Sequence, residues 1–152
     1  MLFRSALFAG IFIHIAANTF NDYFDWKSGT DQANNNYFLP YSGGSRSIEL
    51  GLISEKSLFR VASISLLIAA TLGLILAFRS GPGILVFGLI GALSSYFYTA
   101  PPLRLAARKG IGELVIGLNF GPLATAGTVY ALTGSRSEEH TSELQSQFRI
   151  SY

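Results

Sequence analysis

Long apolar stretches alternate with short polar connections along most of the chain. Four of these stretches approach the roughly 20 residues that a helix needs to cross about 30 Å of hydrocarbon. They cover residues 3–20, 58–78, 83–100 and 111–132. The stretches lack the alternation of barrel strands, and backbone groups in lipid must be hydrogen-bonded within their own segment. The pattern therefore predicts an all-α fold, a polytopic transmembrane helical bundle with about four membrane helices.

Glycine, proline and serine mark the ends of the predicted helices. The Ser-Gly-Pro-Gly sequence at residues 80–83 forms a tight turn, and Pro101 and its neighbour stop the third helix, because proline lacks an amide hydrogen. Ser54 is a candidate N-cap with Glu55 in the first turn behind it, so the second helix is expected to begin near Glu55. Gly29 is suited to end the first helix.

The composition supports the membrane class and excludes one kind of partner. The chain has 152 residues, of which 49% are hydrophobic and 13% are charged, and its mean hydropathy is +0.39. These values are typical of a multi-pass integral membrane protein in a lipid bilayer. The net charge of +2 is small and dispersed, which argues against nucleic acid as a partner.

The basic residues predict the orientation in the membrane. They gather in the first and third connections, whereas the short turn between them holds only Arg79. The positive-inside rule then places the first and third connections together on the cytoplasmic side, in a protein that we expect in a bacterial plasma membrane. The residues concerned are Lys27, Arg46, Lys56, Arg60, Arg104, Arg108 and Lys109.

The character of the chain changes after residue 134. Residues 135–152 are polar and lack any sustained apolar stripe, so they would not support a further span. Their segment RSEEHTSELQS resembles a translated reading frame of a common sequencing adapter. We therefore expect a partial membrane domain over residues 1–134 and a non-native polar tail over residues 135–152.

The most informative polar residues follow the first apolar stretch, in the segment NTFNDYFDWKSGTD. Asn18 and Asp22 are four residues apart, as are Asn21 and Asp25. On a helix this spacing places the four side chains on one flank. That flank is a cluster of oxygen ligands.

Carboxylates at this place require compensation. The C-terminal end of a helix carries partial negative charge, and Asp22 and Asp25 would add like-charge repulsion. A bound cation would make the electrostatic energy of these carboxylates favourable. Hard oxygen ligands without Cys favour Mg²⁺ as that cation. Asp31 lies beyond Gly29, where it is able to turn back toward the same site, so the predicted metal ligands are Asp22, Asp25 and Asp31. The competing interpretation is that these acids are ordinary solvated charges at a membrane boundary.

Two further segments offer groups that suit phosphate. Residues 43–46, with the sequence Gly-Gly-Ser-Arg, present backbone amides and the guanidinium of Arg46. Tyr98 and Arg104 flank the Pro-Pro stop on the same predicted side. A plain turn explains the first segment equally well, and an interfacial aromatic with a snorkelling cation explains the second almost as well.

Four segments in order resemble landmarks of the UbiA superfamily of membrane prenyltransferases. They are NDYFDWKSGTD, GGSRSIELGLIS, YTAPPLR and GELVIGLNFGPL, and the resemblance covers about residues 2–134. The NDYFD form, with YTAPP and FGPL, is most similar to the 1,4-dihydroxy-2-naphthoate polyprenyltransferase branch, which serves menaquinone synthesis.

The resemblance implies transfer of a polyprenyl group from polyprenyl diphosphate to an aromatic acceptor, with Mg²⁺ as cofactor. The family's first aspartate motif matches at Asn21, Asp22 and Asp25, so Asp22 and Asp25 are the expected catalytic residues. Asp31 matches only the naphthoate branch, which makes its ligand role less secure. The expected substrate-binding residues are Asn18, Asn21, Arg46, Tyr98 and Arg104.

The resemblance also implies parts that this sequence lacks. A second aspartate-rich motif and a helix before Phe3 are expected and not found, so we expect the 152-residue chain to be inactive alone. The alternatives are another UbiA-type quinone prenyltransferase, a transporter fragment or a non-catalytic membrane protein. A CDP-alcohol phosphotransferase would also use membrane aspartates, but its Asp-Gly and Ala-Arg landmarks are absent.

Overall fold

A computed structural model of the chain describes residues 2–36, 38 and 44–134. Within these residues every regular element is helical and no strand occurs. The predicted tail at residues 135–152 lies outside the described residues. The helices are α1 (Leu2–Ser28), α2 (Thr30–Ala33), α3 (Glu55–Ser80), α4 (Gly83–Thr99) and α5 (Ile111–Leu118), with a 3₁₀ turn η1 (Leu105–Ala107) and a π-helical turn η2 (Asn119–Leu123).

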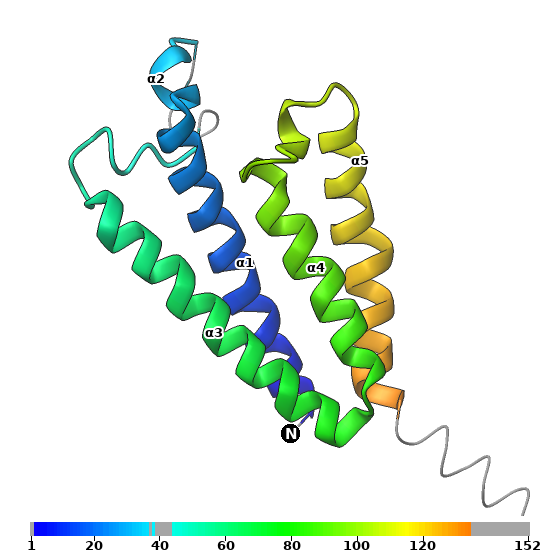
Figure 1. Cartoon of the computed structure of the whole chain (residues 1–152). Coiled ribbons are helices and arrows are strands. Elements are labelled where there is room, and N and C mark those ends of the chain that lie inside the picture. The colour runs from blue at the N-terminus through cyan, green and yellow to red at the C-terminus, as the bar shows by residue number, and fades with distance from the viewer. Residues whose placement is uncertain (1, 37, 39–43, 135–152) are drawn as a thin grey trace, which may run out of the picture.

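The long helices run beside one another as a bundle (Figure 1). α3 packs along α1, and α4 contacts both of them before the chain turns back through α5. The connections after α1 and after α4 lie at one end of the bundle, and the α3–α4 turn lies at the other. The predicted all-α bundle is confirmed, and the two basic connections share one end.

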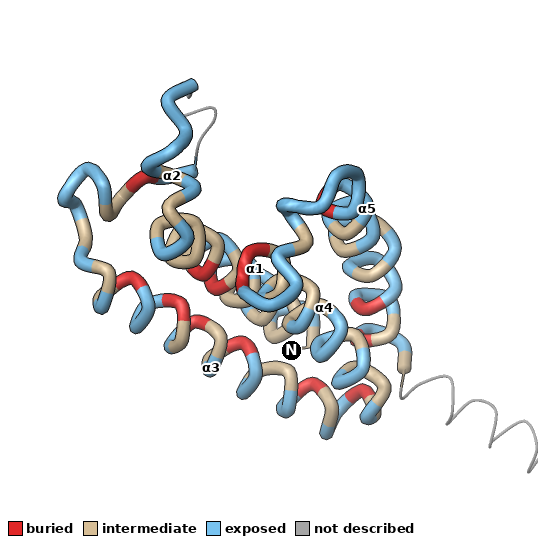
Figure 2. Tube along the Cα trace, turned by 45° about the horizontal axis from the view of Figure 1, so that its top comes forward, coloured by how far each residue is buried: buried red, intermediate tan, exposed pale blue. Residues whose placement is uncertain are grey.

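The packing between α1 and α3 uses small residues. Ala16 of α1 and Ala62 of α3 are almost completely buried, and Phe20 lies in the same cluster. Small side chains let two helix backbones approach closely, which is how helices associate when lipid replaces water around them. Figure 2 shows the buried positions of α3 as a row along one side of the helix.

An aromatic cluster joins α4 to this pair near the end that carries the acids. The ring of Tyr96 lies edge-on to Phe20 and Phe24, with ring centroids 5.7 and 5.4 Å apart. Phe59 of α3 completes the cluster, 5.9 Å from Phe20. Edge-to-face aromatic pairs contribute stability in addition to that of the apolar area they bury. The cluster therefore holds α1, α3 and α4 together next to the polar residues of the site.

The predicted helix ends are confirmed with one extension. Ser54 caps α3, because its hydroxyl accepts a hydrogen bond of 3.2 Å from the amide of Ser57. Gly29 follows α1 in the left-handed conformation, with φ of 78°. α1 continues to Ser28, well past the expected span at residues 3–20. Asn18, Asn21, Asp22 and Asp25 therefore all lie on this helix.

The last helix contains a π-helical turn where the sequence places Asn119 and Pro122. Proline cannot donate a backbone hydrogen bond, and prolines and π-bulges are both places where α-helices depart from regular geometry. Asn119 Oδ1 accepts a hydrogen bond of 2.8 Å from the Ser94 hydroxyl of α4, and its amide donates to the Val115 carbonyl at 2.8 Å. The helix then continues to Gly134.

The far end of the bundle is closed by contacts with the last helix. The backbone amide of Gly83 donates to the Tyr130 hydroxyl at 3.2 Å, and the buried Ser80 hydroxyl donates to the Ala131 carbonyl at 2.6 Å. A Cβ at Gly83 would come within 2.6 Å of the Tyr130 ring. A larger residue at this position would displace the Tyr130 ring from the α3–α4 turn.

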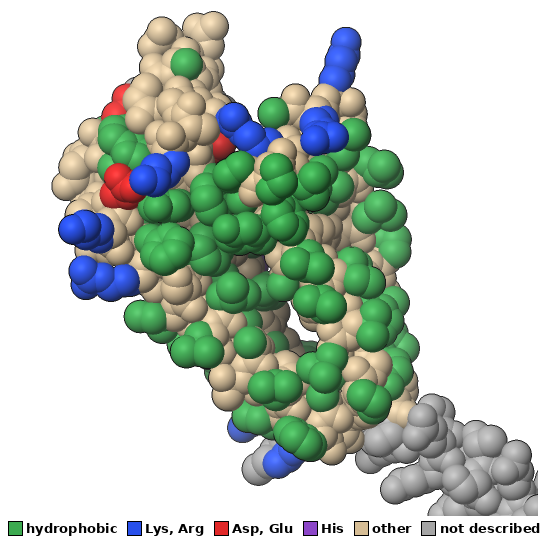
Figure 3. Space-filling model, viewed as in Figure 1, with side chains coloured by type: hydrophobic (Ala, Val, Ile, Leu, Met, Phe, Trp, Pro, Cys, Tyr) green, Lys and Arg blue, Asp and Glu red, His purple; other side chains and the backbone are tan. Residues whose placement is uncertain are grey.

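Three helices of the described chain are long and apolar enough to cross a membrane: Leu2–Ser28, Glu55–Ser80 and Ile111–Gly134. Gly83–Thr99 is apolar and nearly matches the predicted span at residues 83–100, but its 17 residues are slightly fewer than a spanning helix needs. Figure 3 shows apolar side chains over the middle of the molecule and basic ones toward its ends. This distribution is that of an integral membrane protein.

Candidate functional site

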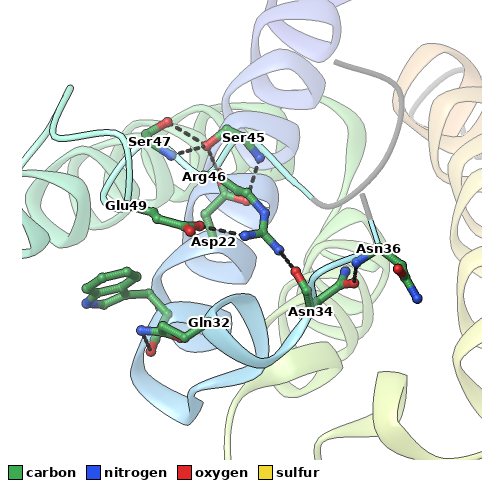
Figure 4. A network of polar contacts seen from close by, with 9 residues as sticks. Asp22, Gln32, Asn34, Asn36, Ser45, Arg46, Ser47 and Glu49 are labelled. Atoms are coloured by element: carbon green, nitrogen blue, oxygen red, sulfur yellow. Dashed lines mark hydrogen bonds and ion pairs between the residues drawn. The ribbon is translucent and has the colours of Figure 1, made fainter. Parts of the chain in front are cut away.

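The predicted site residues come from α1, α2, the loop after them and the end of α4 with its connection, which share one end of the bundle. The last two turns of α1 carry Asp22 and Asp25, and α2 carries Asp31. The loop at residues 44–54 folds back against α1, as Figure 4 shows for its first residues. A residue pair separated by more than twenty positions is thereby brought into contact.

Asp22 holds this loop in place. Its carboxylate accepts a hydrogen bond from the Ser45 hydroxyl and a longer one, 3.5 Å, from the Ser45 backbone amide (Figure 4). The backbone passes so closely that a Cβ on Gly44 would lie 3.0 Å from Asp22 Oδ1, and Gly44 itself has a φ of 71°. Gly44 is therefore required both for its conformation and for this close approach.

Arg46 is a central member of the polar network. Only 3% of the residue is exposed. Its guanidinium donates to Glu49 Oε2 at 2.6 Å and to the Asn34 carbonyl oxygen at 2.7 Å. It therefore ties the segment after α2 to the turn that follows the glycine loop. The predicted phosphate-binding arginine lies at the site, and two of its nitrogens are engaged by the protein itself.

Asp25 and Asp31 lie near each other and near Arg104. The charge of Asp25 interacts unfavourably with Asp31 and Asp22 and favourably with Arg104. Arg104 Nη2 donates to the Thr30 hydroxyl at 3.4 Å, which bridges the connection after α4 to α2. Tyr98 of α4 is within electrostatic reach of Asp25. The structure thus brings four of the predicted site residues to one place.

The electrostatics of Asp31 reflect this crowding. Partial burial raises the pKa of the Asp31 carboxyl, the negative charges of Asp22 and Glu49 raise it further, and the positive charge of Arg46 lowers it. The net direction is upward. A raised carboxyl pKa means that the ionised form is costly in the folded protein, so a cation at this place would be favoured.

The two asparagines differ in their surroundings. Asn18 is exposed, and its amide donates to the His14 carbonyl at 3.0 Å and lies 3.1 Å from His14 Nε2. Asn21 Oδ1 is buried and accepts no hydrogen bond within the described part of the chain. A buried acceptor without a donor is costly, which makes Asn21 a better candidate than Asn18 for an oxygen that meets a ligand.

The residues fit Mg²⁺ by the chemistry of their donors. In the described residues, no group of three or more His, Cys, Asp or Glu side chains converges on one point. Mg²⁺ does not need such a cage, because it keeps several waters and binds through one or two carboxylates and substrate phosphate. The crowded carboxylates and the orphaned Asn21 oxygen are the observations that support a cation here.

Several contributors were not singled out by the sequence pattern. Ser45 orients Asp22, while Glu49 and the Asn34 carbonyl hold Arg46. Glu49 stands three residues after Arg46 in the sequence, a spacing that pairs charges within a turn, and this signal was available. A backbone carbonyl such as that of Asn34 leaves no sequence signal.

Comparison with known proteins gives a consistent group of matches. Residues 1–142 match the UbiA prenyltransferase family. The chain is 33% identical over 121 residues to 1,4-dihydroxy-2-naphthoate octaprenyltransferase of Bacillus subtilis, covering 80% of this chain and 37% of that protein. It is 33% identical to the Mycobacterium tuberculosis protein of the same name, covering 82% and 40%.

A third relative carries a different name. The chain is 30% identical over 138 residues to 2-carboxy-1,4-naphthoquinone phytyltransferase of Synechocystis, covering 90% of this chain and 41% of that protein. The chain thus spans about two fifths of the length of the curated relatives it matches. No solved structure matches.

Proposed function

Because the chain belongs to the UbiA prenyltransferase family, we propose that the protein transfers a polyprenyl group from polyprenyl diphosphate to an aromatic acceptor. We propose 1,4-dihydroxy-2-naphthoate as the acceptor, in menaquinone biosynthesis. The names of two relatives support this acceptor.

One observation carries the proposal beyond the family name. The loop of residues 44–46 is folded against the carboxylates of α1, with Ser45 on Asp22 and Arg46 buried beside it. Acids that attract a cation and a buried guanidinium whose positive charge favours phosphate nearby therefore occupy one site, as Figure 4 shows for the Asp22 side. Cation and phosphate together are what a metal-bound diphosphate presents.

Asp22, Asp25 and Asp31 would hold Mg²⁺ through one or two direct carboxylate contacts and through metal-bound waters, with Asn21 as a further oxygen donor. The metal supplies charge stabilisation for a leaving diphosphate. Arg104 is exposed at the rim and lies within reach of Asp25, so it would contact diphosphate oxygens. Arg46 would position the loop and add positive charge from beneath it.

The chain's own residues would also shape the reaction at carbon. Charge develops on the departing diphosphate, and preorganised positive groups stabilise that state. Tyr98, half-buried at the end of α4, would face the allylic cation through its ring. The apolar helices below exclude water, which protects the cation until the electron-rich acceptor ring attacks it. The attacked ring carbon then loses its proton, or CO2 if it carries the carboxylate, which restores the aromatic ring.

The site's place in the cell forms part of the proposal. Both basic connections lie at the end of the bundle that carries the aspartates. The positive-inside rule then puts the site on the cytoplasmic side of a bacterial plasma membrane. Polyprenyl diphosphate would enter from the bilayer, with its head at the aspartate end.

The test is a prenyl transfer assay on the protein expressed from its native gene in membranes. We expect prenylated naphthoate product when polyprenyl diphosphate, 1,4-dihydroxy-2-naphthoate and Mg²⁺ are all supplied. Asp25→Asn should lower the rate on the order of 100-fold, because a preorganised electrostatic contact is lost. Arg79→Gln, which removes an exposed charge from the last turn of α3 at the opposite end of the bundle, should leave the rate within about twofold.

Two outcomes would count against the proposal. A rate that does not depend on Mg²⁺ would remove the role assigned to the aspartates. Product formed with 4-hydroxybenzoate but not with the naphthoate would keep the reaction class and refute the acceptor.

A further inference from the structure

A separate pocket lies between the last turns of α1 and the first turns of α3, at the same end of the bundle as the aspartates. It has a volume of about 280 Å³ and is lined by Tyr23, Glu55, Lys56, Phe59 and Arg60. None of these residues belongs to the site described above. Figure 3 shows basic side chains gathered over the first turns of α3, where this pocket lies.

The charge of the pocket is positive. Glu55 is paired with Lys27 at 3.0 Å, so the only acid of the pocket is neutralised. Lys56 and Arg60 make no hydrogen bond or ion pair with the rest of the described chain. They are four residues apart on α3, which places them one turn apart on the same face. Two cations without a partner among the described residues thus line one small pocket.

Below the two cations the same face of α3 is apolar and exposed. Ile64 and Leu67 follow Arg60 by four and seven residues, and they are 57% and 68% exposed. The rings of Tyr23 and Phe59, with centroids 5.1 Å apart, form the wall between the polar and the apolar part. Aromatic rings at this depth are typical of a membrane interface.

We propose that this pocket binds the headgroup of an acidic phospholipid, with the phosphate at Lys56 and Arg60 and an acyl chain along Ile64 and Leu67. The two cations match the phosphate of the lipid headgroup, and the adjoining apolar face matches its acyl chain. A free phosphate would use only the first. The position at the predicted cytoplasmic end agrees with the acidic lipids that attract basic groups there.

The experiment is native mass spectrometry of the chain in detergent micelles that contain phosphatidylglycerol or, with the same acyl chains, phosphatidylcholine. We expect retention of phosphatidylglycerol and little retention of phosphatidylcholine. Each cation near an acidic lipid surface contributes about fivefold to binding, so Lys56→Gln with Arg60→Gln should raise the Kd at least about tenfold.

Two double variants serve as controls. Arg4→Gln with Arg79→Gln removes the same charge from exposed positions on α1 and α3 near the opposite end, and it should change the Kd by less than about threefold. Lys56→Arg with Arg60→Lys keeps the charge and should retain the lipid. Helix content from circular dichroism checks that each variant is folded.

A measurement on the unaltered chain makes the test independent of variant folding. Photoactivatable phosphatidylglycerol should label the peptide that contains residues 56–67. Labelling elsewhere, or equal retention of phosphatidylcholine, would overturn the proposal. Displacement of the lipid by an equal concentration of inorganic phosphate or glycerol phosphate would show a site for free phosphate and would also overturn it.

Discussion

Arg46 and Arg104 were both predicted from the sequence to bind substrate, but their surroundings in the structure differ. Arg46 and Arg104 both adopt positive φ, 47° and 43°, a conformation that costs a non-glycine residue energy and persists where the surroundings require it. Arg46 is buried and bound to Glu49 and Asn34, whereas Arg104 is exposed with one long contact to Thr30. Arg46 therefore supports the loop, and Arg104 is available to a ligand.

Substituting the two arginines should separate stability from activity. Arg46→Gln should lower the free energy of unfolding by about 2 kcal/mol, since it leaves buried partners unsatisfied. Arg104→Gln should cost less than about 0.5 kcal/mol in stability but should raise the KM for polyprenyl diphosphate. Unfolding followed by circular dichroism in mixed detergent, together with KM values, distinguishes them. Equal stability losses would contradict the assignment.

The raised pKa of Asp31 predicts a dependence on pH. Between the ordinary and the raised pKa, the folded protein binds more protons than the unfolded chain, so stability falls as pH rises through that window. Asp31→Asn should remove this loss and stabilise the protein at neutral pH. The same substitution should weaken Mg²⁺ binding, because a carboxylate ligand is lost.

Mg²⁺ should also release protons when it binds near the raised Asp31 pKa. Titration calorimetry in two buffers of different ionisation enthalpy measures the number of protons released for each Mg²⁺ bound. The release should shrink as pH rises well above the window, and it should be smaller in Asp31→Asn. Proton uptake on binding would contradict the account.

At the scale of elements, the sequence specified the helix ends better than the contacts between helices. Ser54, Gly29 and the Gly-Pro turn act locally, and the structure confirms each of them. The docking of residues 44–46 onto α1 depends on a fold-back across more than twenty residues, for which local pattern offers no register. The length of α1 was underestimated because its polar last turns end the apolar stretch without ending the helix.

The π-helical turn η2 is joined to α4 by the hydrogen bond between Ser94 and Asn119. Ser94→Ala should leave Asn119 Oδ1 without its interhelical donor and lower stability by about 0.6 kcal/mol, the average for such bonds in membranes. Ser95→Ala, at the next position of α4, is the matched control and should have little effect. Unfolding in mixed detergent measures both. A larger loss in the Ser95 variant would refute the role of this pair.

At the scale of the whole molecule, the acids and most of the basic residues of the described chain gather at one end of an apolar bundle. The aromatic cluster around Phe20 and Tyr96 supports the acids, and the two connections from α1 and α4 converge above it. The family and the fold class followed from sequence landmarks and from hydropathy. The different roles of Arg46 in supporting the loop and of Arg104 in contacting a ligand could not be predicted from the sequence, because they depend on how far each side chain is buried.

The central claim is that the acids of α1 bind a divalent ion and, through it, a diphosphate. The most direct measurement is the Mg²⁺-dependent binding of a non-reactive polyprenyl thiodiphosphate to the protein expressed from its native gene. We predict that the wild-type protein binds this analogue only with Mg²⁺, and that Asp22→Asn with Asp25→Asn abolishes the Mg²⁺-dependent part. Undiminished Mg²⁺-dependent binding by a folded double variant would contradict the claim.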